Sequence, residues 1–124
     1  MEIITNFDIS YISEQFGISN KKLLIYNQGL EGEGKKLLAK IICSYDKDFI
    51  KRVAQGDIKK KENIKYLTLD MICDLFDFRK DSLLEWKSER RVNLKKCLLN
   101  TPVVYVEFIN TTSKLEKELK ALFP

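Results

Sequence analysis

The sequence predicts an α+β fold made of two tandem units, residues 1–60 and 61–124, that pack together as a compact pseudo-dimer. Three observations lead to this prediction. The chain matches itself at an offset of 60 residues, each copy begins with a two-helix pattern around a turn residue, and apolar segments with the composition of strands follow each pair. Because a unit of about 60 residues is marginal alone, the two copies are expected to share a core.

The internal repeat is clearest where residues 8–26 lie over residues 68–86. In this register the large apolar residues coincide: Ile12 with Ile72, Phe16 with Phe76, Leu23 with Leu83, and Tyr26 with Trp86. Further along, the same offset places Lys35 and Lys36 on Lys95 and Lys96, and Tyr45 on Tyr105. Two copies of one unit are therefore expected, with Phe76 and Trp86 in the core.

A helix–turn–helix opens each copy. In the first copy, apolar residues at 9, 12 and 16 form one helical stripe, Gly17 can adopt the positive φ of a tight turn, and Ser19 is placed to cap the next helix. That second helix is expected to turn Leu23 and Tyr26 inward. In the second copy Asp77 stands at the position of Gly17, and aspartate also tolerates the left-handed region.

The segments after these helix pairs are expected to supply the β-structure. Residues 35–45 read as a strand or strand pair, and residues 46–55 read as a helix. In the second copy we expect the second helix to run on through Arg90 and Arg91. The segment "PVVYVEFI" (102–109) has the composition of a strand.

Residues 113–123 form the last expected element, an amphipathic helix. Ser113 and Glu116 have the spacing of a capping box. One side of the helix carries Leu115, Leu119 and Leu122. This leucine side is a candidate homodimer contact, and the alternative is that it covers the sheet.

The order of helix–turn–helix, hairpin and helix resembles the winged helix–turn–helix superfamily of DNA-binding proteins. Residues 8–53 are most similar to its MerR and excisionase branch. The stretch "ISEQFGISNKKLLIYNQGL" resembles that branch in its Gly-hydrophobic-Ser turn, its aromatic-ended second helix and its Gly-Leu exit, and "SYDKDFIKRV" resembles the segment after the wing. The sequence departs from the branch at Leu24 and Leu84, where an arginine is usual. The resemblance implies two winged units and sequence-specific binding to double-stranded DNA.

The outward side of the first unit's second helix is the candidate DNA-reading surface. At about 100° per residue, with Leu23 at the centre of the buried side, this surface holds Asn20, Lys21, Lys22, Ile25 and Gln28. Lysines can hold phosphates or guanine edges, asparagine or glutamine can pair with adenine, and isoleucine can contact a thymine methyl group.

Two further groups of basic residues are candidate DNA contacts. Paired lysines near the start of each expected wing can lie along the backbone or reach a minor groove: Lys35, Lys36, Lys95 and Lys96. Four residues flank the second unit's second helix and can touch phosphates from its ends: Arg79, Lys80, Arg90 and Arg91. The outward side of that helix carries Asp81 and Glu85, which phosphates would repel, so the second unit is expected to be structural or dimerising.

Composition excludes several classes of function. The 124 residues carry a net charge of +4 and contain no histidine, so the commonest general base and metal ligand is absent. Three cysteines without Cys-x-x-Cys spacing favour packing in a reducing compartment. Neither a membrane-spanning run nor a signal-peptide pattern is present, so we expect a cytoplasmic protein with no membrane partner. We expect no enzyme activity, no cofactor, no metal and no small-molecule substrate.

The sequence therefore predicts a sequence-specific double-stranded DNA-binding protein, either a transcriptional regulator or a plasmid or phage accessory factor acting in transfer, partition or excision. The alternative is a protein-interaction adaptor whose helix–turn–helix units are degenerate. The acidic surface of the second copy and Leu24 favour the adaptor, whereas the lysines of the first unit oppose it. The basic stretch 59–65 is expected to be a solvated linker between the copies.

Overall fold

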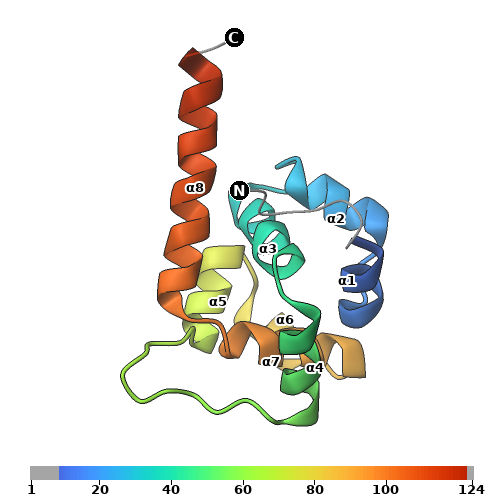
Figure 1. Cartoon of the computed structure of the whole chain (residues 1–124). Coiled ribbons are helices and arrows are strands. Elements are labelled where there is room, and N and C mark those ends of the chain that lie inside the picture. Colours follow the sequence, from blue (N-terminus) through green and yellow to red (C-terminus); the bar gives the residue numbers. More distant parts are fainter. Residues whose placement is uncertain (1–8, 123–124) are drawn as a thin grey trace.

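The computed structural model describes residues 9–122, with side chains for residues 9–112, and contains eight helices in this range (Figure 1). The first half contributes α1 (Ile9–Phe16), α2 (Asn20–Asn27), α3 (Glu33–Cys43) and α4 (Lys47–Gln55). The second half contributes α5 (Leu69–Phe76), α6 (Lys80–Leu84), α7 (Glu89–Leu99) and α8 (Val103–Leu122). Within these residues the only β-pairing is an isolated bridge between Tyr66 and Pro102. The predicted α+β winged fold is therefore wrong, and the described chain is all-helical.

The two helix–turn–helix pairs form as predicted. Gly17 has a φ of 67°, and Asp77, at the equivalent turn, has a φ of 58°. The Ser19 hydroxyl accepts a hydrogen bond of 3.1 Å from the backbone N–H of Lys22, so it caps the N-terminus of α2. Local turn and cap chemistry was sufficient to predict this part of the fold.

The strand predicted over residues 35–45 is the helix α3. Its fully buried residues are Leu38, Ala39, Ile41 and Ile42. Their spacing of three and four residues is the period of a helix with one buried face, and this period outweighs the strand preference of the isoleucines. No hairpin forms here, so the first predicted wing is wrong.

The strand predicted over residues 102–109 is the beginning of α8. Val106 and Ile109 are buried one helical turn apart, and Pro102 precedes the first helical residue, where a missing N–H costs nothing. Because α8 continues to Leu122, Ser113 lies inside the helix and does not cap it. The predicted helix over 113–123 is thus the second half of α8; its side chains and Phe123 lie outside the described residues.

A break in the second half corrects another prediction. The α6 helix ends at Leu84, and α7 begins at Glu89 with Ser88 as its cap. Arg90 and Arg91 therefore lie in the first turn of α7, not on an extension of α6. The helix predicted over residues 46–55 is present as α4, capped by Asp46.

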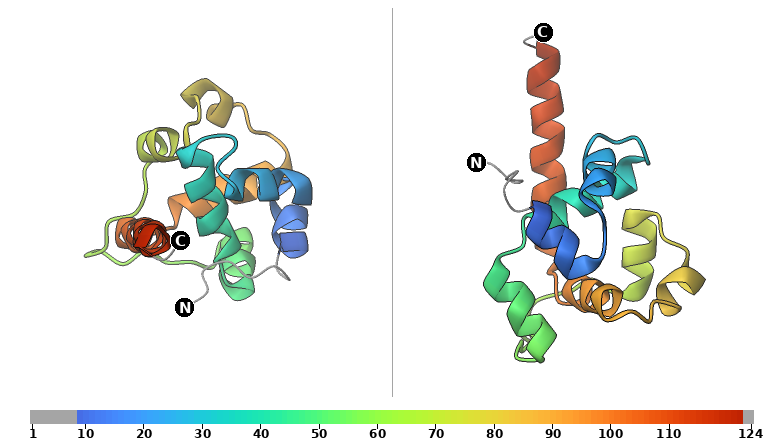
Figure 2. Two further views of the ribbon diagram at one scale, coloured as in Figure 1. Left: turned by 90° about the horizontal axis from the view of Figure 1, so that it is seen from above. Right: turned by 90° about the vertical axis from the view of Figure 1, so that its right-hand side faces the viewer.

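The two halves repeat the same order of four helices, and the third helix of each half packs against helices of the other half. The α3 helix of the first half lies against α5 and α8 of the second, and α7 of the second half lies against α1 and α4 of the first (Figures 1 and 2). One continuous core results, with Phe16, Leu38, Phe76 and Leu94 all fully buried at its centre.

The helix α8 extends beyond the other helices. Figure 1 and the right-hand view of Figure 2 show its C-terminal half projecting from the body formed by α1 to α7. None of the described helices combines the length and the apolar composition that crossing a bilayer requires.

Candidate nucleic-acid interface

The α2 helix presents the polar surface that the sequence predicted. Asn20, Lys21, Lys22 and Gln28 are exposed, and Ile25 is half-buried. The helix contains no acidic residue, and its capped N-terminus adds the positive end of the helix dipole. Leu23 anchors the opposite side in the core. The exposed groups therefore share one helix that the core holds in place.

Two contacts orient side chains on this surface. The Asn20 amide donates a hydrogen bond of 3.3 Å to the Ser10 hydroxyl on α1. The ammonium of Lys22 lies 5.9 Å from the centre of the Tyr26 ring. Both contacts are weak and solvent-exposed, so the two side chains remain able to reach another molecule.

Lys35 belongs to the fold instead. Its ammonium donates hydrogen bonds to the backbone carbonyls of Phe76, at 2.6 Å, and Asp77, at 2.8 Å, and lies 3.9 Å from the centre of the Phe78 ring. Burial lowers the pKa of Lys35. With its donors committed to the turn between α5 and α6, Lys35 is not a surface contact, and its predicted place on a wing is wrong.

The neighbouring Lys36 is half-buried against the turn that follows α2. A methyl group added at Gly29 would lie 3.6 Å from the Cδ atom of Lys36. Lys35 and Lys36 therefore sit on a helix and not on a hairpin.

Arg91, in the second half, contacts the helix–turn–helix turn of the first half, as Lys35 contacts that of the second half. Its guanidinium donates to the backbone carbonyl of Gly17 at 3.3 Å and lies 5.5 Å from the centre of the Trp86 ring. Arg90 lies directly beside Gly17, with its Cβ and Cδ atoms 3.4 Å from the position of an added methyl group. Both arginines thus support the turn between α1 and α2.

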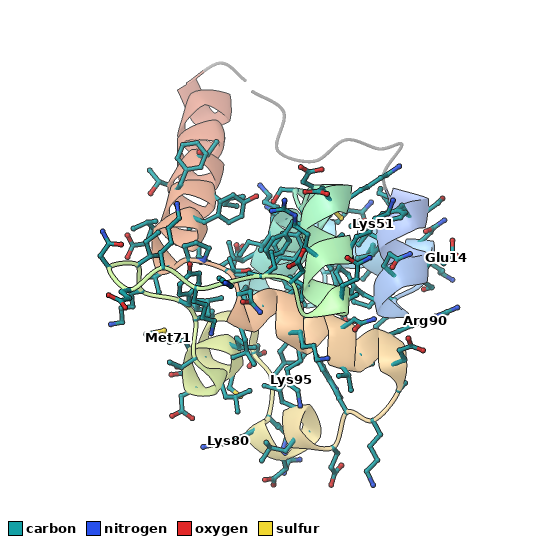
Figure 3. All side chains as sticks on the ribbon, turned by 60° about the horizontal axis from the view of Figure 1, so that its bottom comes forward. Glu14, Lys51, Met71, Lys80, Arg90 and Lys95 are labelled. Carbon is teal, nitrogen blue, oxygen red and sulfur yellow. The ribbon has the colours of Figure 1, made fainter. Side chains whose placement is uncertain are left out.

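The remaining predicted residues do not join the α2 surface. Arg79 and Lys80 are exposed at the start of α6, where Lys80 forms an ion pair of 3.1 Å with Asp70. Lys95 is half-buried on α7 and Lys96 is exposed. Figure 3 shows Lys80 and Lys95 near α6, away from Arg90, which lies beside α1. Of the thirteen predicted DNA contacts, five lie on α2 or at its C-cap, and the other eight lie on α3, α6 and α7 or at the N-cap of α6.

The sequence did not predict a pocket where α3 meets α4 and α7 meets α8. It has a volume of about 300 Å³ and is lined by Ser44, Tyr45, Asp46, Phe49, Thr101, Pro102 and Tyr105. Tyr45 and Phe49 lie at the junction of α3 and α4, and Tyr105 follows the junction of α7 and α8. Their positions near helix ends are a signal in the sequence, but their convergence depends on the packing of one half against the other.

The cysteines lie in packed positions. Cys43 and Cys97 are buried, Cys73 is half-buried, and none of the three is joined to another in a disulfide. Burial raises the pKa of Cys97 to about 12, so its thiol is neutral and unreactive at physiological pH. In the described part of the chain, no cluster of histidine, cysteine or carboxylate side chains could hold a metal ion.

Comparisons with protein-family models, with curated proteins and with solved structures gave no match to this chain.

Proposed function

We propose that this protein binds double-stranded DNA through α2 and reads base edges with the side chains at the two ends of that helix. The observation that carries the proposal is the exposed outer side of α2, the second helix of the first helix–turn–helix, which contains no acidic residue. Lys21 and Lys22 would neutralise phosphates, and Asn20 and Gln28 would contact bases.

The second helix–turn–helix would not enter a groove in the same way. Its α6 helix has only five residues and exposes Asp81 and Glu85. Carboxylates at these positions are repelled by phosphates. The second half instead supports the first, because Arg91 holds the α1–α2 turn from which α2 projects. A regulator of transcription or an accessory factor of a plasmid or phage is the proposed setting.

A second copy of the chain is the proposed partner of α8. Val104 and Phe108 are 68% and 52% exposed and lie one turn apart on this projecting helix. Pairing of two such helices would bury both residues. Light scattering should then give a dimer for the wild type and a monomer for Phe108→Glu; a monomeric wild type would rule out this contact.

An adaptor function is the second candidate. Leu24 and Leu84, at equivalent positions of α2 and α6, are 45% and 56% exposed. Apolar side chains on the outer sides of both helices suit a protein partner better than a phosphate backbone. Recovery of a stoichiometric protein partner after nuclease treatment, abolished by Leu24→Ser, would favour this candidate.

Selection of bound sequences from random duplexes tests the DNA proposal. An enriched motif is expected, and the affinity for it should fall with salt at a log–log slope of about −0.9 for each phosphate contact. The double variant Lys21→Ala/Lys22→Ala should lower that slope by about 2. Lys59→Ala/Lys61→Ala, which removes the same charge from the exposed connection between α4 and α5, is the matched control.

Two results would contradict this function. Equal losses of affinity in both double variants would mean that binding follows net charge and not the α2 surface. No enriched motif, together with a salt-independent affinity, would exclude duplex DNA as the ligand.

Gln28→Ala should change base preference while leaving the salt slope unchanged.

A further inference from the structure

The pocket between the two halves has walls that favour one class of ligand. Three aromatic rings form much of its surface, from Tyr45, Phe49 and Tyr105. The rings of Tyr45 and Phe49 stand 5.0 Å apart at an angle of 47°, so they form two sides of a corner and not a flat stack. The faces of aromatic rings carry negative electrostatic potential and attract cations.

The protons of the pocket hydroxyl groups are already committed. Thr101 donates to the carbonyl of Cys97 at 2.8 Å, so the 2.6 Å contact between Thr101 and Tyr45 must use the Tyr45 proton. Ser44 donates to the carbonyl of Ile41 at 2.6 Å, so Tyr105 must donate in its short contact with Ser44. Toward the pocket these hydroxyl groups can only accept hydrogen bonds.

The remaining polar group of the pocket wall is a carboxylate. Asp46 is exposed at the rim and caps α4 through a 3.3 Å hydrogen bond from the backbone N–H of Asp48. The ends of four helices meet here, but the C-termini of α3 and α7 offset the N-termini of α4 and α8, so no net dipole favours an anion. Acceptors and a negative charge line this pocket.

The aromatic rings of the pocket also differ from others in the molecule. Five rings elsewhere carry a cation of the chain itself: Tyr11 with Lys47, Tyr26 with Lys22, Tyr66 with Lys60, Phe78 with Lys35, and Trp86 with Arg91. The three rings of the pocket are not among them. Among the described residues, no lysine or arginine lies over the ring of Tyr45, Phe49 or Tyr105.

We propose that this pocket binds a small organic cation whose ammonium group carries alkyl substituents. The rings of Tyr45, Phe49 and Tyr105 would surround the alkylated nitrogen, and Asp46 would supply the balancing charge. A pocket of about 300 Å³ is at the lower end of the range for ligand sites, which suits a compact cation. Such a ligand would bridge the two halves and stabilise the fold.

Titration of the 124-residue protein with choline tests the proposal, and the neutral isostere 3,3-dimethyl-1-butanol is the control. Choline should bind saturably, raise the melting temperature, and show N-methyl proton signals shifted upfield by the aromatic rings. The isostere should bind at least about tenfold more weakly, because it lacks the charge. Equal affinity for the two compounds, or no saturable choline binding below about 10 mM, would overturn the proposal.

Three variants locate the site. Asp46→Asn keeps a side chain that can cap α4 and should weaken choline binding about tenfold. Phe49→Leu removes one ring and should weaken it about five- to tenfold. Phe78→Leu, at another half-buried ring that lies between α5 and α6 and does not line the pocket, is the matched control and should leave binding unchanged. Unchanged affinity in both pocket variants would place choline elsewhere and overturn the assignment.

The same cation could arrive free or as a methylated lysine side chain, and the pocket size favours the free form. A peptide containing trimethyllysine, titrated beside choline, separates the two. Choline binding at least as tightly as the peptide supports a free ligand. Markedly tighter binding of the peptide would overturn that part of the proposal.

Discussion

Lys35 and Arg91 occupy equivalent positions on α3 and α7, and each donates hydrogen bonds to the helix–turn–helix turn of the opposite half. A second reciprocal contact accompanies this exchange. Gly17 lies against Arg90, and Asp77 lies against Gly34, so each crossing pairs a glycine with a larger residue. The two turns are therefore held by the other half's third helix, and neither half would keep its geometry alone.

Replacing Lys35 should test the first of these contacts. Lys35→Met keeps the aliphatic stem but removes the bonds to the Phe76 and Asp77 carbonyls and the contact with Phe78. Because charge-assisted bonds are lost, the free energy of unfolding should fall by about 1–2 kcal/mol, measured by urea denaturation. Lys96→Met, at an exposed position of α7, should change it by less than about 0.5 kcal/mol. Equal effects of the two substitutions would contradict the role of Lys35.

Replacing Gly34 with alanine tests the contact between α3 and α5, because the sign of the change in unfolding free energy depends on that contact. Glycine to alanine within a helix normally stabilises by about 1 kcal/mol. At Gly34, however, the added methyl group would lie 3.0 Å from the Leu75 carbonyl oxygen and the Phe76 carbonyl carbon, which are backbone atoms. We expect Gly34→Ala to destabilise by about 1–3 kcal/mol in thermal or urea unfolding.

The matched control for that change is Ala54→Gly on the exposed side of α4, which should cost only the helix propensity of about 0.5–1 kcal/mol. A stabilised Gly34→Ala protein would mean that α3 and α5 are not in close contact at this position.

The helix–turn–helix pairs were predictable because their signals are local. Gly17, Ser19 and Asp77 act on the backbone within three residues of themselves, so sequence alone identifies their roles. The α3 helix and the beginning of α8 were mistaken for strands because their isoleucines and valines favour strands, a preference that is weak and that packing can override. What makes 38–42 helical is burial against α5 and α8, which are distant in the sequence.

The same cause explains the misplaced site residues. The α3 helix begins 13 residues after the start of α2, whereas α7 begins nine residues after the start of α6. The offset between equivalent residues of the two halves therefore changes from 60 to 56 after the second helix. Lys35 therefore corresponds to Arg91 and not to Lys95. A fixed offset could not reveal the difference, and the contact of Lys35 with residues more than 40 positions away could not be read from spacing.

Asp77 offers a stabilising substitution. Its backbone has φ 58° and ψ 48°, a left-handed conformation that costs an L-residue about 1 kcal/mol and glycine nothing. Asp77→Gly keeps the carbonyl that accepts from Lys35, so stability should rise by about 0.5 kcal/mol after the greater freedom of glycine in the unfolded chain is subtracted.

The control for that substitution lies one turn earlier on the same helix. Asp74→Gly, at an exposed position inside α5, should destabilise by about 0.3 kcal/mol in the same melting experiment, because aspartate is only a slightly better helix former than glycine. Destabilisation by both changes would indicate that the Asp77 side chain contributes more than its backbone costs.

Alkaline unfolding should report the burial of Cys97. Burial raises the pKa of this thiol from its ordinary value of 9.0 to about 12, so between these values the folded protein retains a proton that the unfolded chain releases. The folded state then binds more protons, and its stability falls as pH rises, by about 1.4 kcal/mol per pH unit from this group. Burial also raises the pKa of Tyr45 and Tyr11, which adds to the fall, whereas the pKa of Lys35, lowered by burial, opposes it.

Cys97→Ala should therefore flatten the decline of unfolding free energy between about pH 9 and pH 11, measured by urea denaturation in the presence of a reductant. Leu94→Ala, at another fully buried position of α7, removes core volume without removing a titrating group. It should lower stability at every pH and leave the slope unchanged, because a cavity costs the same free energy in either protonation state. Parallel curves for the wild type and Cys97→Ala would show that the thiol is as accessible to water in the folded protein as in the unfolded chain.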